Sequence, residues 1–82
     1  MMKTQTNIKE KEISHFYSDD DRLKAVVMEG DECFFVDFYK DDVIIDSRRV
    51  EGHTLRYAED MAENYISGVI WYNHRTGRVH GV

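Results

Sequence analysis

The chain has 82 residues, of which 41% are hydrophobic and 33% are charged, and its formal net charge is −5. A chain of this length buries only roughly 60–65% of the surface that it exposes when unfolded, which favours one small domain and excludes a deep cleft between two lobes. The hydrophobic content is too high for a disordered protein, and the acidic balance disfavours nucleic-acid backbones and anionic membranes.

The sequence is typical of a reduced, cytoplasmic compartment. Cys33 is the single cysteine, so the chain cannot form an internal disulfide, and no segment resembles a secretory signal peptide. The longest apolar stretches, Ala25–Met28 and Val69–Tyr72, are far too short to span a membrane. We expect a cytoplasmic protein without a membrane partner.

The N-terminal segment is polar and lacks periodicity, and we expect residues 1–12 to be a flexible leader. His15–Tyr17 is either a short strand or a segment that packs over a sheet edge. The turn formers of Ser18–Asp21 end that segment.

Three strands are predicted next, over Arg22–Met28, Cys33–Tyr39 and Val43–Val50, because apolar side chains alternate with polar ones in these runs. The connectors between them are short and polar, and the first contains Gly30. Such connectors fit hairpins, so the strands are expected to form an antiparallel meander.

After Gly52 the hydrophobic period changes from two to 3.6, which predicts an amphipathic helix. Thr54 is the expected N-cap, and Gly68 either ends the helix or lies within it. The apolar stripe of this helix is Leu55, Ala58, Ala62, Tyr65 and Val69.

The predicted fold is therefore α+β, with a three-stranded antiparallel meander packed on one C-terminal amphipathic helix (β-β-β-α). Residues 13–70 form the single domain and residues 71–82 a C-terminal tail without clear periodicity. The helix is expected to cover the sheet face that contains Leu23, Phe34, Val36, Phe38, Val43 and Ile45.

The other sheet face is predicted to carry Val26, Met28, Phe35, Tyr39 and Ile44 beside Lys24, Asp37, Asp46 and Arg48. That face is too apolar to be freely solvated. Its cover is the N-terminal segment, the tail, or a second molecule, either another copy or a different protein. The predicted partner-binding residues are Val26, Phe35, Tyr39, Ile44, Arg48, Trp71 and Tyr72.

Candidate catalytic and metal-binding residues give no consistent pattern. Cys33 begins an apolar strand and is interpreted as a small buried hydrophobe rather than a nucleophile. The histidines match no common ligand spacing, and the Asp19–Asp21 run lacks the rest of a calcium loop. Acids such as Asp41, Asp42 and Asp46, or Glu59, Asp60 and Glu63, are interpreted as solvated. We expect no catalytic residue, metal or cofactor.

Arg48, Arg49 and Arg56 are the one compact basic group in the predicted domain. Together with Arg75 and Arg78 of the tail they are candidates for binding phosphate or nucleic acid. The competing interpretation, which we favour, is that they pair with Asp46, Glu51 or Glu59.

Three parts of the chain, Phe35–Tyr39, Ser47–Arg48 and Tyr57–Tyr65 followed by Gly68, resemble small proteins encoded by marine tailed cyanophages. The resemblance covers about residues 22–70 and transfers no site residue. It implies a viral protein in a bacterial cytoplasm, of a kind that often binds host proteins or serves the virion. The expected function is a non-enzymatic protein-interaction module, whose partner is a host protein or a second copy; nucleic acid is the alternative.

Overall fold

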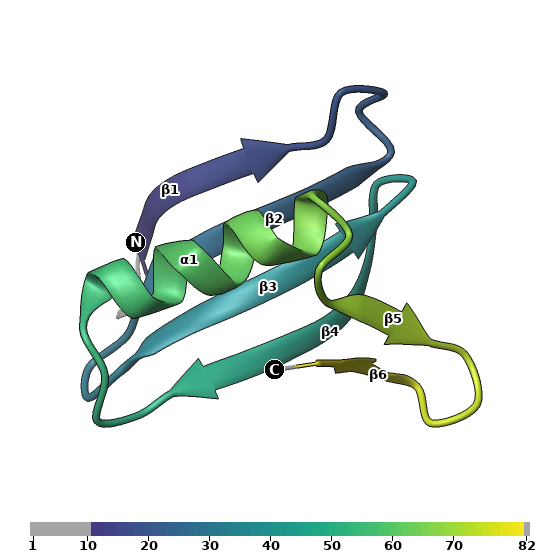
Figure 1. Cartoon of the computed structure of the whole chain (residues 1–82). Helices are drawn as coiled ribbons and strands as arrows, with labels where there is room; N and C mark the ends of the chain where they lie inside the picture. Colours follow the sequence, from purple (N-terminus) through teal and green to yellow (C-terminus); the bar gives the residue numbers. More distant parts are fainter. Residues whose placement is uncertain (1–10, 82) are drawn as a thin grey trace, which may run out of the picture.

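The computed structural model describes residues 11–81, which form a four-stranded antiparallel sheet, one helix and a small second sheet (Figure 1). The predicted α+β class is confirmed, but the predicted number of strands is wrong. The elements are β1 (Lys11–Tyr17), β2 (Leu23–Glu29), β3 (Phe34–Lys40), β4 (Val43–Val50), α1 (Leu55–Ile66), β5 (Trp71–Asn73) and β6 (Arg78–His80). The predicted leader lies mostly outside the described residues, and its last two residues, Lys11 and Glu12, belong to β1.

The large sheet is a meander in which each strand pairs with its neighbour in sequence, in the order β1-β2-β3-β4. The tightest connection joins β3 to β4 through Asp41 and Asp42, whose φ angles are 51° and 67°. Positive φ at both central residues is what a two-residue type I′ hairpin requires, and Asp tolerates that backbone better than most residues. This turn fixes β3 and β4 as adjacent antiparallel strands, as predicted.

Strand β1 is the element that the sequence pattern did not establish. It pairs with β2, but the register shifts between Glu12 and Ser14, so that Ile13 is an extra residue in a β-bulge. A bulge interrupts the period-two alternation, because the side chains before and after it no longer alternate in phase. Only Ser14–Tyr17 keep a regular alternation, which is too short to identify a strand with certainty.

Helix α1 begins where the sequence predicted. The Thr54 hydroxyl accepts a hydrogen bond from the Tyr57 backbone N–H at 3.3 Å, as an N-cap should. The helix ends at Ile66, because Gly68 adopts a φ of 87° and turns the chain away. Val69, which was predicted to extend the apolar stripe, is therefore outside the helix and 61% exposed.

The core lies between α1 and the sheet, where the helix contacts β1, β2 and β3. Ala58 and Ala62 are fully buried, and their small side chains allow the helix to approach the sheet closely. The Phe38 and Tyr65 rings meet edge to face with centroids 4.8 Å apart. The buried core comprises Ala25, Val27, Val36, Phe38, Val50, Ala58, Met61, Ala62, Tyr65, Ile70 and Val79.

A second bulge, in β4, corrects the predicted assignment of side chains to the two sheet faces. Phe38 pairs with Asp46 and Tyr39 pairs with Ile44, so Ile45 is the extra residue. Past that point the alternation of β4 is reversed, and Asp46 and Arg48 lie on the helix side instead of the opposite face. Val43, predicted to face the helix core, is 61% exposed at the end of the sheet.

The predicted tail contains a short hairpin, β5–β6, that packs beside β4 (Figure 1). It contributes Val79, which is fully buried, and Tyr72, which packs against the core. Three-residue strands are too short to show a hydrophobic period, so no pattern in the sequence predicted them. The helix and the hairpin together close one side of the sheet.

Candidate interaction surface

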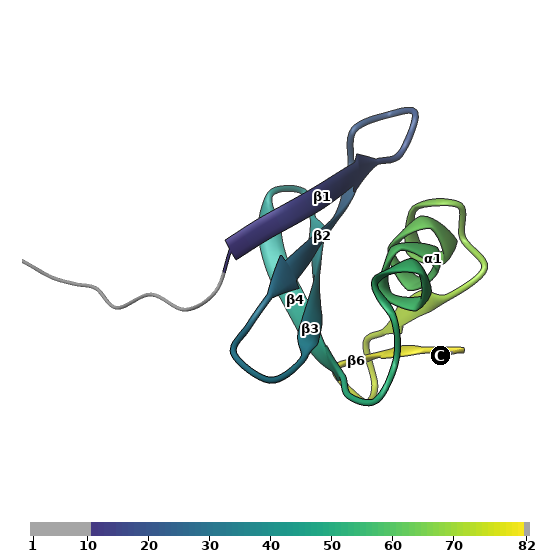
Figure 2. The ribbon, with the colours of Figure 1, turned by 90° about the vertical axis from the view of Figure 1, so that its left-hand side faces the viewer.

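The other side of the large sheet has no covering element within residues 11–81. Figure 2 shows α1 and β6 on the same side of the sheet, with only strands toward the other side. We call this second surface the open face. The strand pairing places on it Glu12, His15 and Tyr17 from β1, Lys24, Val26 and Met28 from β2, Phe35, Asp37 and Tyr39 from β3, and Ile44, Ser47 and Arg49 from β4.

Two cations lie over the aromatic rings of the open face. The Lys24 ammonium is 4.4 Å from the centroid of the Tyr39 ring and 5.9 Å from that of Tyr17. The Arg49 guanidinium lies 5.6 Å from the Phe35 ring centroid. A cation over a ring is attracted by the negative π face. The side chains of Lys24 and Arg49 thus lie along the sheet and over the aromatic rings of the face.

Two polar pairs complete this surface. The Ser47 hydroxyl donates to a carboxylate oxygen of Asp37 at 2.6 Å, across strands β3 and β4. Glu12 and His15 meet at 2.7 Å although they are three residues apart, because the bulge at Ile13 brings both onto the open face. Glu12 and Arg49 therefore lie on the two outer strands of the face, and Lys24 and Asp37 lie on its two inner strands, among apolar side chains.

Exposure is uneven across the open face. Tyr17 and Ile44 are 51% and 50% exposed, whereas Val26, at the centre, is only 6% exposed because its neighbours enclose it. Phe35, Tyr39 and Met28 are partly exposed. The face thus exposes aromatic and aliphatic side chains, with Glu12 and Arg49 on its outer strands and Lys24 and Asp37 between them.

The predicted partner-binding residues divide between two places. Val26, Phe35, Tyr39 and Ile44 lie together on the open face. Arg48 does not, because of the β4 bulge, and Trp71 and Tyr72 belong to the hairpin on the other side of the sheet. Sequence reasoning missed Tyr17 and Arg49 as members of the face. Tyr17 was hidden by the uncertain first strand, and Arg49 by the unrecognised bulge.

Asp46 and Arg48 bind the hairpin to β4. The Asp46 carboxylate, 7% exposed, accepts from the Val79 backbone N–H at 2.8 Å and from the Arg78 guanidinium at 3.2 Å. Arg48 donates to the Val79 carbonyl oxygen. The two side chains thereby bind both backbone polar groups of Val79, in place of a backbone ladder between β4 and β6.

The pKa of Asp46 reflects this environment. Burial raises it, but the N–H groups of Val79 and Ser47 and the charge of Arg78 lower it more, so the pKa of the carboxyl lies below its usual value of 3.8. Asp46 is therefore ionised at neutral pH and acts as a structural anchor.

Four of the five arginines considered for phosphate binding are engaged with acids, and the favoured interpretation predicted the partners of Arg48 and Arg49. Arg49 contacts Glu51 at 2.6 Å and Arg56 contacts Asp60 at 3.6 Å, while Arg48 and Arg78 share Asp46. Arg56 pairs one turn along the helix, with Asp60 instead of Glu59. The four guanidinium groups are thus divided among three carboxylates, those of Asp46, Glu51 and Asp60.

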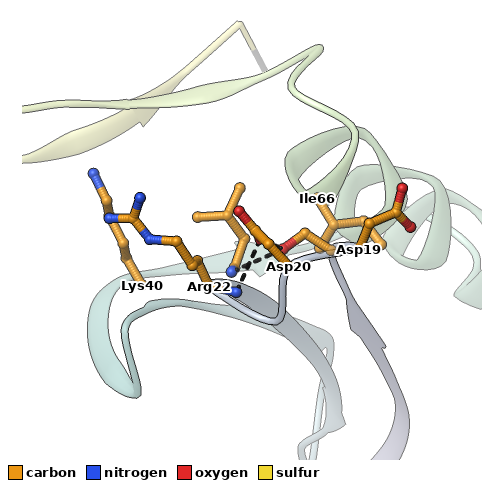
Figure 3. Close-up of a pocket in the computed structure, with 7 residues that line it drawn as sticks. Asp19, Asp20, Arg22, Lys40 and Ile66 are labelled. Carbon is orange, nitrogen blue, oxygen red and sulfur yellow. Dashed lines mark hydrogen bonds between the residues drawn. The ribbon is translucent and has the colours of Figure 1, made fainter.

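A hollow of about 440 Å³ lies at the end of the sheet between the β1–β2 loop and the last turn of α1 (Figure 3). Asp20 accepts from the Ser18 hydroxyl and from the Arg22 backbone N–H, and these bonds lower the pKa of its carboxyl below 3.8. Arg22 also pairs with Asp41 at 3.1 Å. Ser18, Asp20 and Arg22 thus stabilise the loop at the rim of this hollow, which is the structural role of an Asx-type turn.

The remaining candidate residues are dispersed. Cys33 is partly exposed in the β2–β3 connection, not buried as expected, because β3 begins one residue later. His53 stacks on Tyr57 with centroids 3.9 Å apart, and His80 contacts the Thr76 hydroxyl at 2.7 Å. Between Lys11 and Gly81, no group of three or more His, Cys, Asp or Glu side chains is arranged to hold a metal ion.

Comparisons with known proteins give no assignment. No family model, no curated protein and no solved structure matches the chain. In the part of the chain that the structure describes, no helix has the length and apolar character needed to cross a membrane. The geometry of the open face is therefore the main guide to function.

Proposed function

We propose that this chain is a non-enzymatic protein-interaction module whose open face binds a protein surface. The observation that carries the proposal is the patch of Tyr17, Val26, Phe35, Tyr39 and Ile44 on a face that no element of residues 11–81 covers. Contiguous apolar patches of this kind mark interaction sites on small soluble proteins.

The composition of the face supports a protein partner. Aromatic residues and Arg are enriched at the centres of protein interfaces, and charged groups are common at the rims. Phe35 and Tyr39 provide rigid anchors near the middle, while Glu12 and Arg49 provide charge at the outer strands. Burying these aromatic groups supplies affinity, and the charges select the orientation.

The resemblance to small cyanophage proteins sets the proposed location. On that basis the module works in the cytoplasm of an infected bacterium, where it binds a host protein or another copy of itself. The nucleic-acid alternative through Arg48, Arg49, Arg56 and the C-terminal segment is less well supported, since Arg48 is held by Asp46 and by the hairpin. The net charge of −5 also opposes phosphate binding.

The test is site-specific photo-crosslinking of the full chain in a lysate of its native host cells. A benzoylphenylalanine replaces Tyr39 on the open face in one variant and Tyr57, which is 42% exposed on the helix side, in the control. We expect one dominant protein adduct from position 39, competed away by excess wild-type chain, and none from position 57.

The mass of the adduct distinguishes a host protein from a second copy. Adducts of equal yield from both positions, or no competable adduct from position 39, would contradict the proposal. Adducts with nucleic acid from position 39 would favour the alternative.

A further inference from the structure

We propose that the partner of the open face is a second copy of this chain, packed face to face about a two-fold axis that runs along the strands. This inference rests on the proposed function and names its partner. It is drawn from the cross-strand register of the face, which makes the surface complementary to itself.

The strand pairing orders the open face into three rows that cross the sheet from β1 to β4. The first row is Tyr17, Lys24, Tyr39 and Ile44; the second is His15, Val26, Asp37 and Ser47; the third is Glu12, Met28, Phe35 and Arg49. In the third row, for example, the residues at the two ends, Glu12 and Arg49, have opposite charges.

With a two-fold axis along the strands, each row of one copy faces the same row of the second copy. The order of the residues along the row is reversed. Strand β1 of one copy then lies over β4 of the other, and β2 lies over β3. Two sheets stacked in this way have nearly aligned strands, which is one of the two common packings of sheet on sheet. The interface is isologous, as in most homodimers.

The third row shows the complementarity most clearly. Glu12 of one copy lies over Arg49 of the second copy, and Met28 lies over Phe35. Two ion pairs thus form per dimer at opposite edges of the interface, beside the contacts of Glu12 with His15 and of Arg49 with Glu51 within each chain. Two sulfur–aromatic contacts form between the inner strands.

The first row also matches, and the second row matches at its two ends. Tyr17 lies over Ile44, and Lys24 lies over Tyr39, whose ring already attracts the Lys24 of its own chain at 4.4 Å. His15 lies over Ser47, whose hydroxyl is bonded to Asp37. In the second row Val26 lies over Asp37, whose carboxylate keeps the Ser47 hydroxyl of its own chain as its partner. The complementarity is therefore carried by the first and third rows.

The alternative face-to-face axis, across the strands, is less favourable. It places Asp37 over Asp37 of the second copy and His15 over His15, and it opposes Glu12 to Tyr17 and Arg49 to Ile44. Like charges directly opposed are destabilising, and both outer ion pairs are lost. The charge pattern therefore selects the axis along the strands.

The size of the face sets the expected strength. Seven residues at about 3.3 Å and four strands at about 4.8 Å give a planar area of roughly 440 Å² per copy. A standard interface buries about 800 Å² per partner, so this dimer belongs to the weak class. We expect self-association at about micromolar concentrations, dependent on protein concentration and weakened by salt.

Sedimentation equilibrium of the full chain with charge-swap variants tests the inference. Glu12→Lys and Arg49→Glu should each raise the dimer dissociation constant at least about tenfold, because each opposes like charges twice per dimer. The double variant should restore it to within about threefold of the wild type. Glu63→Lys and Arg56→Glu are matched controls on the exposed helix surface, and they should leave it unchanged.

A monomeric wild type up to about millimolar concentration would overturn the inference, as would a double variant no better than the single ones, or a dimer insensitive to both. A monomer that still gives a competable host-protein adduct from position 39 would overturn self-pairing alone and leave the proposed function intact. A monomer with no such adduct would remove both.

Discussion

The two faces of the large sheet are made by the same strands, but one is buried against the helix and the hairpin and the other is uncovered within residues 11–81. On the covered face, Val27, Val36 and Phe38 are fully buried against α1, and the edge strand β4 is closed by the hairpin. On the open face, apolar residues of similar size alternate with Lys24, Asp37 and Arg49. The first face gives the fold its stability, and the second has apolar surface beyond what the fold of residues 11–81 uses.

The largest expected difference in stability is between substitutions of two phenylalanines of β3 that lie on opposite faces, Phe35 and Phe38. Phe38→Ala removes a fully buried ring and should lower the free energy of unfolding by about 3–5 kcal/mol. Phe35→Ala, on the open face, should lower it by only about 1 kcal/mol, because Phe35 is already partly exposed. Urea unfolding followed by circular dichroism measures both.

Should Phe38→Ala fail to fold, the Phe→Leu substitution at both positions provides the comparison, with an expected loss of about 1.5 kcal/mol at position 38 and a smaller loss at position 35. Equal losses at positions 35 and 38 would remove the distinction between the two faces.

The second largest effect concerns the attachment of the hairpin to the covered side. Asp46→Ala leaves the Val79 N–H without its acceptor and should cost about 1–3 kcal/mol, with faster hydrogen exchange at Val79. Asp60→Ala, which removes an exposed carboxylate of α1, is the control and should cost less than about 0.5 kcal/mol.

The same carboxyl predicts a pH dependence. Because the pKa of Asp46 is lower in the folded chain than its unfolded value of 3.8, its stabilisation is full above about pH 4 and is lost as the pH falls below that value. The difference in unfolding free energy between wild type and Asp46→Asn should therefore shrink between pH 7 and pH 2. A difference that stays constant across this range would contradict the anchoring role.

Tyr65 gives a smaller effect at the opposite end of the pH scale. Its hydroxyl donates to the Tyr39 carbonyl at 3.1 Å, and burial raises the pKa of Tyr65 to about 12. Stability from the neutral phenol is complete below pH 10 and decreases as the pH rises toward 12. Tyr65→Phe should cost about 1 kcal/mol at pH 8 and lose this alkaline dependence, whereas Tyr57→Phe should retain it.

The smallest expected effect is on the open face itself. Lys24→Met keeps the aliphatic stem but removes the ammonium from the Tyr39 and Tyr17 rings, so the unfolding free energy should fall by about 0.5–1 kcal/mol. A loss above about 2 kcal/mol in thermal or urea unfolding would mean that the open face is part of the stabilising core.

Much of the covered side was predictable from the sequence, because its signals are local. The period change at Gly52 identified α1, Thr54 identified its start, and the aromatic alternation of β3 identified the buried row with Val36 and Phe38. These features follow from residue spacing and from one capping hydroxyl. Seven residues of the open face, including Phe35 and Tyr39, were predicted for the same reason.

The features that escaped prediction depend on contacts between distant parts of the chain. The bulges at Ile13 and Ile45 change which face a side chain occupies, and no residue type in the sequence marks them. The hairpin is held by Asp46 and Arg48, more than 30 residues away, so its strands show no pattern of their own. Arg48 was therefore assigned to the wrong face.

Adjacent residues of β4 allow the most direct test of the open face as a binding surface. Ile44 is 50% exposed on that face, and Val43 is 61% exposed on the opposite side of the same strand. The dissociation constant of the complex, with a second copy or with the crosslinked protein, should rise at least about tenfold for Ile44→Lys and stay within about twofold for Val43→Lys. Equal effects of the two lysines, or a loss of binding with Val43→Lys alone, would contradict the account.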